Sequence, residues 1–253
     1  MLTRIGTGFL GVTEAAGSFT AFVLATVVSV FKRPFEGREI SKQLETVGVA
    51  SFPVVGVTAL FTGMVFTLQT YSGFARFGAE GYVPGVLAVA LFRELVPVLG
   101  GMMFAGRVAS AIAAELGAMR VTDQIDALEV MGTDPIHYLV VPRFIACTLM
   151  LPLLVTLGDL IGLVGGWWLV THVLDTPSPA FIDQAFEFLD PEDFWSGFIK
   201  ATFFGAIVGT VGCFTGLHTR GGAEGVGQST TRAVVMSCLY ILVFDFFITK
   251  VLL

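Results

Sequence analysis

The chain has 253 residues, of which 55% are hydrophobic and only 13% are charged, and its mean hydropathy is +0.83. Its net charge of −6, without a basic cluster or an aromatic stacking platform, excludes a nucleic-acid-binding surface. Several apolar runs approach the ~20 residues that a helix needs to cross a bilayer. The composition therefore predicts an all-α polytopic membrane protein.

The sequence lacks the patterns of common catalytic sites. It contains no GxxxxGK[ST] phosphate-binding loop and no HExxH or GxSxG motif. Cys147, Cys213 and Cys238 lie in apolar runs without CxxC spacing, so we expect small buried residues. Three histidines near the predicted membrane edges are assigned no chemistry: His137, His172 and His218. We expect a non-catalytic subunit with no metal and no cofactor.

Residues 1–33 predict a helix that lies in the membrane interface, with a true membrane span as the alternative. Its polar residues gather on one helical face, a pattern typical of interfacial helices: Thr3, Thr7, Glu14, Ser18 and Ser29. Lys32, Arg33 and Pro34 stand where a signal peptide would carry small cleavage-site residues, so cleavage is not expected. Pro34 ends the helix, and the basic residues that follow indicate a cytoplasmic N-terminus.

Five apolar stretches predict five transmembrane helices: 47–71, 83–114, 144–171, 194–217 and 231–252. Pro53, with Gly56 and Gly63, predicts a bent or re-entrant first span. Small residues recur three or four positions apart in three spans, as in Gly158, Gly162 and Gly166. Such faces are typical of close helix contacts. Asp159 lies among them and is expected to serve helix packing.

The distribution of charge predicts the orientation of the spans. The loop 173–193 carries six acidic residues and no Lys or Arg. Five arginines fall on the opposite side: Arg107, Arg120, Arg143, Arg220 and Arg232. By the positive-inside rule, 173–193 faces outward and 115–143 faces the cytoplasm. Residues 218–232 then form a Gly-rich inner loop, and the C-terminus lies outside.

Charged residues are concentrated in the segment 115–143: Glu115, Arg120, Asp123, Asp126, Glu129, Asp134 and Arg143. Thr122 can cap a short helix that Gly132 closes, and acids in its first turn suit the helix dipole. An apolar face completes the amphipathic pattern: Ala118, Val121, Ile125 and Leu128. We predict a docking helix, with a solvated loop as the alternative. Its apolar face should pack on the span ends, leaving the acidic side and the Gly132 turn for a partner.

Two runs carry a family resemblance: FRELVPVLGGMMFAGR, from Phe92 to Arg107, and AELGAMRVTDQIDALEVMGTDPIHYLVVPR, from Ala114 to Arg143. They closely resemble the MlaE (YrbE) family of ABC-transporter permeases, which work with MCE proteins in moving lipids. The resemblance implies one permease domain over residues 1–253, in a bacterial inner membrane, with a periplasmic C-terminus.

The resemblance also implies partners. The chain would form a homodimer and bind a cytoplasmic ABC ATPase, on which a STAS-type regulator can sit. An MCE-domain subunit would carry the phospholipid. The segment 115–143 would then be the coupling element between permease and ATPase, through seven residues: Glu115, Arg120, Asp123, Asp126, Glu129, Gly132 and Asp134.

Four ionisable residues inside the predicted spans form a second candidate site: Arg93, Glu94, Lys200 and Asp245. Each costs at least ~2.5 kcal/mol at a bilayer centre unless it faces protein, water or a partner charge. Adjacent Arg93 and Glu94 diverge by ~100° and need not pair, whereas a Lys200 to Asp245 contact is geometrically reasonable. These residues either line a lipid cavity, with Arg93 or Lys200 attracting a phosphate headgroup, or form structural ion pairs. Leu68 and Tyr71 are candidates for the cavity's apolar wall.

Two other functional classes stay open on the sequence alone. An ion-coupled secondary transporter or channel would use the same four charges as a midplane relay, although no inverted repeat is visible. A passive membrane anchor of a peripheral complex would need the docking segment and not the buried charges.

Overall fold

The computed structural model describes residues 2–32, 37–173 and 179–252. Every regular element in these ranges is helical. Five stretches are long and apolar enough to cross a membrane: Gly37–Phe77, Glu80–Val121, Ile136–His172, Pro191–Leu217 and Gly222–Leu252. A shorter apolar helix, Ala16–Val30, precedes them. The predicted fold class, with five spans after an N-terminal helix, is confirmed.

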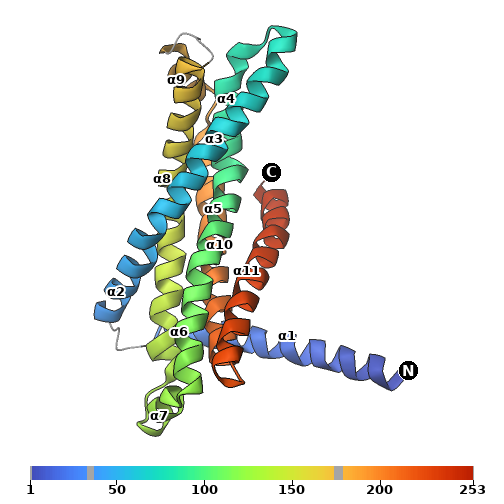
Figure 1. The fold of residues 1–253 in the computed structure, drawn as a ribbon, viewed down its shortest axis with the longest axis vertical. Coiled ribbons are helices and arrows are strands. Elements are labelled where there is room, and N and C mark those ends of the chain that lie inside the picture. The colour runs from blue at the N-terminus through green and yellow to red at the C-terminus, as the bar shows by residue number, and fades with distance from the viewer. Residues whose placement is uncertain (1, 33–36, 174–178, 253) are drawn as a thin grey trace.

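The first stretch combines α2 (Gly37–Gly48), the 3₁₀ turn η1 (Val49–Ser51) and α3 (Phe52–Phe74). Pro53 lies in the first turn of α3, where its missing N–H costs no hydrogen bond within the helix. Figure 1 shows α2 and α3 as one oblique helix along the bundle. The re-entrant alternative is therefore wrong, and the helix starts well before residue 47.

The second stretch contains two π-helical segments. After the short turns η2 (Ala75–Phe77) and η3 (Glu80–Tyr82), it runs through α4 (Val83–Ala90), η4 (Leu91–Leu95), α5 (Val96–Phe104), η5 (Ala105–Ala109) and α6 (Ser110–Val121). The π-helical segments are η4 and η5, and each carries an arginine at its third position, Arg93 and Arg107. Segments of this kind interrupt the regular hydrogen-bond ladder and are frequent at functional sites.

The central helix, α8 (Val141–His172), follows α7 (Gln124–Val130) and the π-helical segment η6 (Ile136–Val140). It packs against α3 and against α10 (Pro191–Leu217). Gly63 of α3 lies directly on the backbone of Gly162, and Gly205 of α10 lies on the backbone of Cys147. A Cβ atom would not fit at either contact, so the small-residue faces are close helix contacts, as predicted.

Two predicted loops contain helix. Residues 218–232 do not form a long loop, because α11 (Gly222–Leu252) already starts at Gly222 and leaves only a short turn. The positive φ of Gly221 and of Gly222 allows that sharp turn. In the segment 173–193, α9 (Pro179–Glu187) packs on α4, and the Phe188 ring lies 6.0 Å from that of Tyr82. Asp175 lies outside the described residues.

The N-terminal helix α1 (Leu2–Val30) lies across one end of the bundle, roughly at right angles to the other helices (Figure 1). Its Phe19 and Phe22 rings lie 5.2 Å and 5.4 Å from the ring of Phe214 in α10. This orientation agrees with the predicted interfacial helix. Arg33 and Pro34, which were expected to follow and end it, lie outside the described residues.

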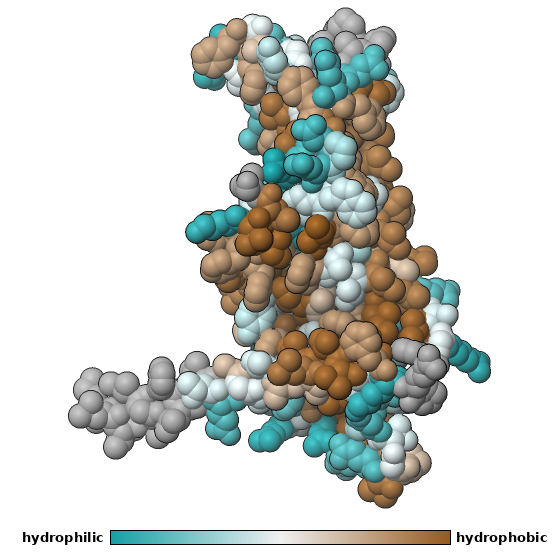
Figure 2. All heavy atoms as spheres, turned by 180° about the vertical axis from the view of Figure 1, so that it is seen from behind, coloured by the Kyte–Doolittle hydropathy of each residue, from teal (hydrophilic) through white to brown (hydrophobic). Residues whose placement is uncertain are grey.

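The surface follows the same division. Figure 2 shows apolar residues along much of the bundle, with hydrophilic residues at the end that carries α7, at the opposite end and in a patch between them. Figure 1 places α7 and α9 at opposite ends of the bundle. The α7 end and the α9 end are therefore the two faces that a bilayer would separate.

Candidate functional site

A cluster of five charged side chains lies between η4, α10 and α11. We call it the charge cluster, and it consists of Arg93, Glu94, Asp193, Lys200 and Asp245. The ammonium of Lys200 lies 2.7 Å from Glu94 Oε2 and 3.3 Å from Asp245 Oδ1. Arg93 Nε lies 3.3 Å from Asp193 Oδ1. The predicted Lys200 to Asp245 contact is confirmed, and Arg93 and Glu94 each pair with a different residue.

A proline explains why Lys200 is needed at this place. Pro97 has no N–H, so it cannot donate to the carbonyl of Arg93 four residues earlier, as a helix would require. The ammonium of Lys200 donates to that carbonyl at 2.9 Å instead. Gly197, one turn before Lys200, lets α10 approach, because its Cα lies against the backbone of Phe92. Lys200 therefore replaces the backbone hydrogen bond that Pro97 removes from the second span.

The two cations of the cluster differ in access. Lys200 has no exposed surface, and its ammonium contacts three oxygen atoms of other helices. Arg93 keeps a third of its side chain exposed, although its Nε faces Asp193. Glu94 is 40% exposed and accepts a hydrogen bond from the Thr249 hydroxyl at 3.2 Å. A ligand that reaches the cluster can therefore contact Arg93 and Glu94, but not Lys200.

Asp193 was missed as a member of the cluster, because it was assigned to the acidic loop before the fourth span. A signal for it existed in the sequence. Asp190 is the N-cap of α10, and its side chain accepts a hydrogen bond from the backbone N–H of Asp193. The Asp190 N–H in turn donates to Asp193 Oδ2 at 3.0 Å, which completes a capping box. This motif starts the helix before Asp193 and puts Asp193 on the same face as Lys200, seven residues later.

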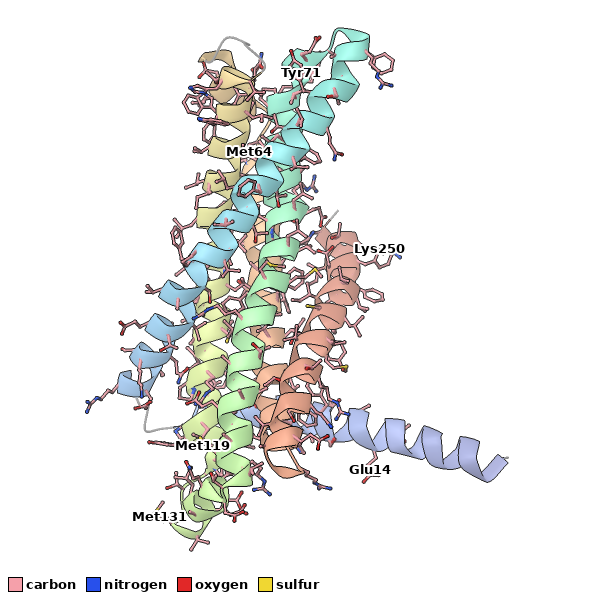
Figure 3. All side chains as sticks on the ribbon, viewed as in Figure 1. Glu14, Met64, Tyr71, Met119, Met131 and Lys250 are labelled. Atoms are coloured by element: carbon pink, nitrogen blue, oxygen red, sulfur yellow. The ribbon has the colours of Figure 1, made fainter. Side chains whose placement is uncertain are left out.

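An apolar groove opens between α3 and η4, beside Glu94. It has a volume of about 380 Å³ and is lined by Phe61, Thr62, Val65, Phe66, Gln69 and Leu95. Leu68 and Tyr71 lie on α3 but do not line this groove, and Figure 3 shows Tyr71 close to the α9 end. Their contact with lipid stays a prediction. Leu95, which lines this groove, directly follows Glu94 of the charge cluster in the sequence.

The segment 115–143, which we call the α7 hairpin, projects from the bundle at the end opposite α9 (Figure 1). Thr122 does not cap α7, because its hydroxyl donates to Ala118 O at 2.9 Å and so ends α6. Asp123 is the N-cap residue and takes a left-handed conformation, with φ of 56°. Gly132 closes the helix as predicted, with φ of 76° and its N–H on Glu129 O at 2.9 Å. The seven residues of α7 thus lie between two residues with left-handed backbone conformation, Asp123 and Gly132.

The predicted apolar face of the hairpin is divided between two helices. Ile125 is buried and Leu128 packs against the core, but Val121 belongs to α6 and is 36% exposed. The most exposed apolar side chains of the hairpin are instead at its tip, where Val130 is 89% and Met131 70% exposed. Figure 3 shows Met131 at this tip. The acidic residues Asp123, Asp126 and Glu129 surround it as exposed side chains.

Ion pairs fix the base of the hairpin. The buried guanidinium of Arg143 lies 2.9 Å from Glu115 Oε1 and donates to Leu139 O at 2.6 Å. Arg120 pairs with Asp126, and Lys32 at the end of α1 lies 3.6 Å from Asp134 Oδ2. Glu115, Arg120, Asp126 and Asp134 were predicted as partner contacts, and in the structure each already has a partner within the chain.

Within the described ranges, Asp159 and the three histidines form no metal-binding group. Asp159 is buried among the small residues of α8, as expected for a packing position. His172 and His218 each contact a carbonyl of their own helix, and His137 Nδ1 lies 3.2 Å from Ser29 O. In the described ranges, no group of three or more His, Cys, Asp or Glu residues could hold a metal ion.

The bundle, its charge cluster beside an apolar groove and the projecting hairpin together define a multi-pass membrane protein of the permease type. Comparison with known proteins identifies the family. The family model described as Permease MlaE matches residues 40–251. The chain therefore belongs to the MlaE permease family, and the resemblance seen in the sequence is confirmed.

Relatives over most of the chain support this assignment. A protein of Rickettsia felis, named "Probable ABC transporter permease protein", is 44% identical over 97% of this chain and 95% of its own length. A protein of Synechocystis with the same description is 45% identical over 84% of this chain and 81% of its own. The chloroplastic protein TRIGALACTOSYLDIACYLGLYCEROL 1 of Arabidopsis thaliana is 42% identical over 88% of this chain and 64% of its own.

Replacement of Lys200 by methionine tests the structural role of the ammonium. The change leaves two carboxylates without their cation, which typically costs about 3–5 kcal/mol. We expect the Lys200→Met protein to lose much of its thermal stability in detergent, as measured by its unfolding temperature. The triple variant Lys200→Met, Glu94→Gln, Asp245→Asn should recover most of this loss, and Lys250→Met, at an exposed position of α11, should melt like the wild type. Wild-type melting of Lys200→Met would contradict the assignment.

Proposed function

We propose that this chain is the permease subunit of an ABC transporter that moves phospholipid between the inner membrane and an MCE-domain partner. A separate cytoplasmic ATPase supplies the energy. One observation carries the proposal: within the membrane-spanning bundle, the partly exposed guanidinium of Arg93 lies two residues before Leu95, which lines an apolar groove. A phospholipid needs both a cationic partner for its phosphate and an apolar wall for its acyl chains.

The structure favours Arg93 over Lys200 as the headgroup contact. A planar guanidinium can hold phosphate oxygens with two parallel hydrogen bonds, and a third of the Arg93 side chain is exposed for this purpose. Lys200 is buried and committed to three protein oxygens, so we assign it to the fold. The same burial weakens the ion-relay alternative, because a relay through Lys200 would need access that the described structure does not provide.

The α7 hairpin is the proposed site of the ATPase. Its exposed tip residues, Val130 and Met131, suit an apolar pocket of a partner, and the surrounding acidic side chains suit a basic rim. The names of the Rickettsia and Synechocystis relatives also support an ABC system. The phosphate-binding motif is absent from this sequence, so we place ATP hydrolysis in the partner. Coupling requires that the hairpin makes different contacts in the two nucleotide states.

We also propose a homodimer, in which a second copy encloses the groove. Among the five candidate spans, α11 is the least buried, at 11% over its most apolar window compared with 61% for α10. Its exposed apolar residues offer a large surface for that contact: Leu239, Leu242, Val243, Phe244, Phe246 and Phe247. An MCE-domain subunit and a STAS-type regulator on the ATPase complete the proposed complex, as the family resemblance implies.

The proposed location is a bacterial inner membrane, with the N-terminus in the cytoplasm and the C-terminus in the periplasm. Positive charge supports this orientation, because the end of the bundle that carries α7 also holds Arg120 and Arg143. The segment with α9, at the other end, has no Lys or Arg. The Arabidopsis relative bears the name of a galactose-containing glycerolipid, which supports an amphiphilic substrate.

Substitution at the hairpin tip tests the ATPase site. The Met131→Glu change puts a charge on the proposed apolar contact but leaves the fold intact, because Met131 is largely exposed. We expect at least tenfold less ATPase subunit to co-purify with the chain in mild detergent. We also expect loss of ATP-dependent phospholipid transfer in proteoliposomes. The matched control is Val173→Glu, at an exposed position near the opposite end of α8. The ATPase site is refuted if Met131→Glu and charge reversal at Asp126 both leave association and transfer at wild-type levels.

Substitution of Arg93 tests the headgroup contact. Loss of one charge-assisted hydrogen bond, worth about 1.5–3 kcal/mol, should lower the phospholipid retained by the purified complex at least tenfold in Arg93→Gln. Lipid is measured by mass spectrometry after extraction. Asp193→Asn, which removes the protein partner and keeps the guanidinium, should retain lipid. Equal lipid content in wild type and Arg93→Gln would rule out this role for Arg93.

A further inference from the structure

We propose that Arg107 and Ser51 form a second phosphate site, where a phospholipid headgroup enters from the inner leaflet before it reaches the groove. This inference rests on the proposed function, because it assumes phospholipid as the substrate. It assigns a ligand to a side chain that the charge cluster and the hairpin leave without a role.

Arg107 is a partly buried cation held by a neutral group. Its Nη1 donates to Ser51 Oγ at 2.9 Å, and the Ser51 hydroxyl in turn donates to Val47 O. Ser51 is buried, so this contact fixes the guanidinium at the junction of η1 and α3. In the described part of the chain, no carboxylate lies within ion-pair distance of Arg107. By contrast, Arg93, Arg143 and Lys200 each have a carboxylate partner.

The position of Arg107 along the second span suits an anionic partner. Arg107 lies 14 residues after Arg93 and 14 before Val121, the last residue of α6. At 1.5 Å per residue it is about 21 Å along the helix from each. A bilayer has a hydrocarbon core about 30 Å thick, so Arg107 lies near its inner boundary. A guanidinium at that depth is stable when it meets water, protein acid or lipid phosphate, and the phosphates of the inner leaflet are at this level.

A polar stripe across η1 and α3 runs from this position to the groove. Polar residues recur at intervals of seven, four and seven residues, which places them on one helix face: Ser51, Thr58, Thr62 and Gln69. Ser51 holds Arg107, and Thr62 and Gln69 line the groove together with Leu95. The helices α3 and α5 are in contact between these points, since Val55 packs on Gly100.

The stripe has the chemistry of a headgroup path. The Thr58 hydroxyl donates to Val54 O at 2.8 Å and keeps its oxygen lone pairs for donors of a headgroup. Beside the stripe, the exposed side chains of Phe61 and Val65 offer an apolar surface to acyl chains. A phosphate bound at Arg107 can therefore move along α3 toward Arg93 while its acyl chains stay in an apolar environment. The two arginines of the π-helical segments mark the two ends of this path.

Photocrosslinking in the complete complex tests the inference. The photoreactive residue p-benzoylphenylalanine replaces Thr62 in the full chain, expressed with its partners in cells grown with [³²P]phosphate. We expect phospholipid crosslinked at position 62 to fall about tenfold in Arg107→Gln, the effect of losing one charge-assisted hydrogen bond. Arg107→Lys, which keeps the charge, should retain most of the label. A reporter at Leu153, an exposed position of α8, should label equally in all variants.

Four other outcomes overturn the inference. Unchanged labelling at position 62 in Arg107→Gln would show that Arg107 does not load lipid. An equal decrease at positions 62 and 153, in a variant that keeps the wild-type unfolding temperature, would show that the effect is not specific to the path. Binding of inorganic [³²P]phosphate to the purified complex that depends on Arg107, without a lipid adduct at position 62, would assign the site to free phosphate. Benzophenone inserts into C–H bonds, so free phosphate gives no adduct. If the wild type labels no more at position 62 than at 153, the lipid path itself fails, and with it the proposed function.

Discussion

The pairing of Lys200 with the broken second span is the interaction on which the membrane part depends. Pro97 leaves the Arg93 carbonyl without its helical donor, and an unpaired carbonyl in a bilayer is costly. Lys200 supplies the donor from α10, but its own charge then needs compensation. Glu94 and Asp245 provide it, the second from α11. One missing N–H thus leads to a charge cluster that joins three helical stretches.

The cluster has a second consequence for the proposed lipid transport. Because Lys200 is buried among its partners, only Arg93 and Glu94 of these three residues are accessible to a ligand. A fully open pair of cations would hold a phosphate too firmly to release it, whereas a guanidinium shared with Asp193 can exchange partners. The α7 hairpin, at the far end of the same helical stretch as Arg93, lies where an ATPase can act on that exchange.

Much of this arrangement could be predicted from the sequence, and the failures have physical causes. Hydropathy and charge predicted the five spans, and helix geometry predicted the Lys200 to Asp245 contact. The π-helical segments were not predicted, since a shift in hydrogen bonding leaves the apolar pattern almost unchanged. Asp193 was overlooked because an acidic segment before a span suggests a loop, although its capping box marks a helix start. The exposed tip at Val130 and Met131 was not predicted. The second span was predicted to end at residue 114, whereas α6 continues to Val121. The prediction of a long inner loop was wrong, because two glycines with positive φ make a tight turn directly before α11.

Native mass spectrometry of the complex, purified in mild detergent from its own membranes, tests the central claim most directly. The account predicts an assembly with two copies of this chain, an ATPase subunit and bound phospholipid, from which the lipid is released when ATP and Mg²⁺ are added. A chain that purifies without an ATPase and without phospholipid, or whose bound lipid does not respond to ATP, would contradict it.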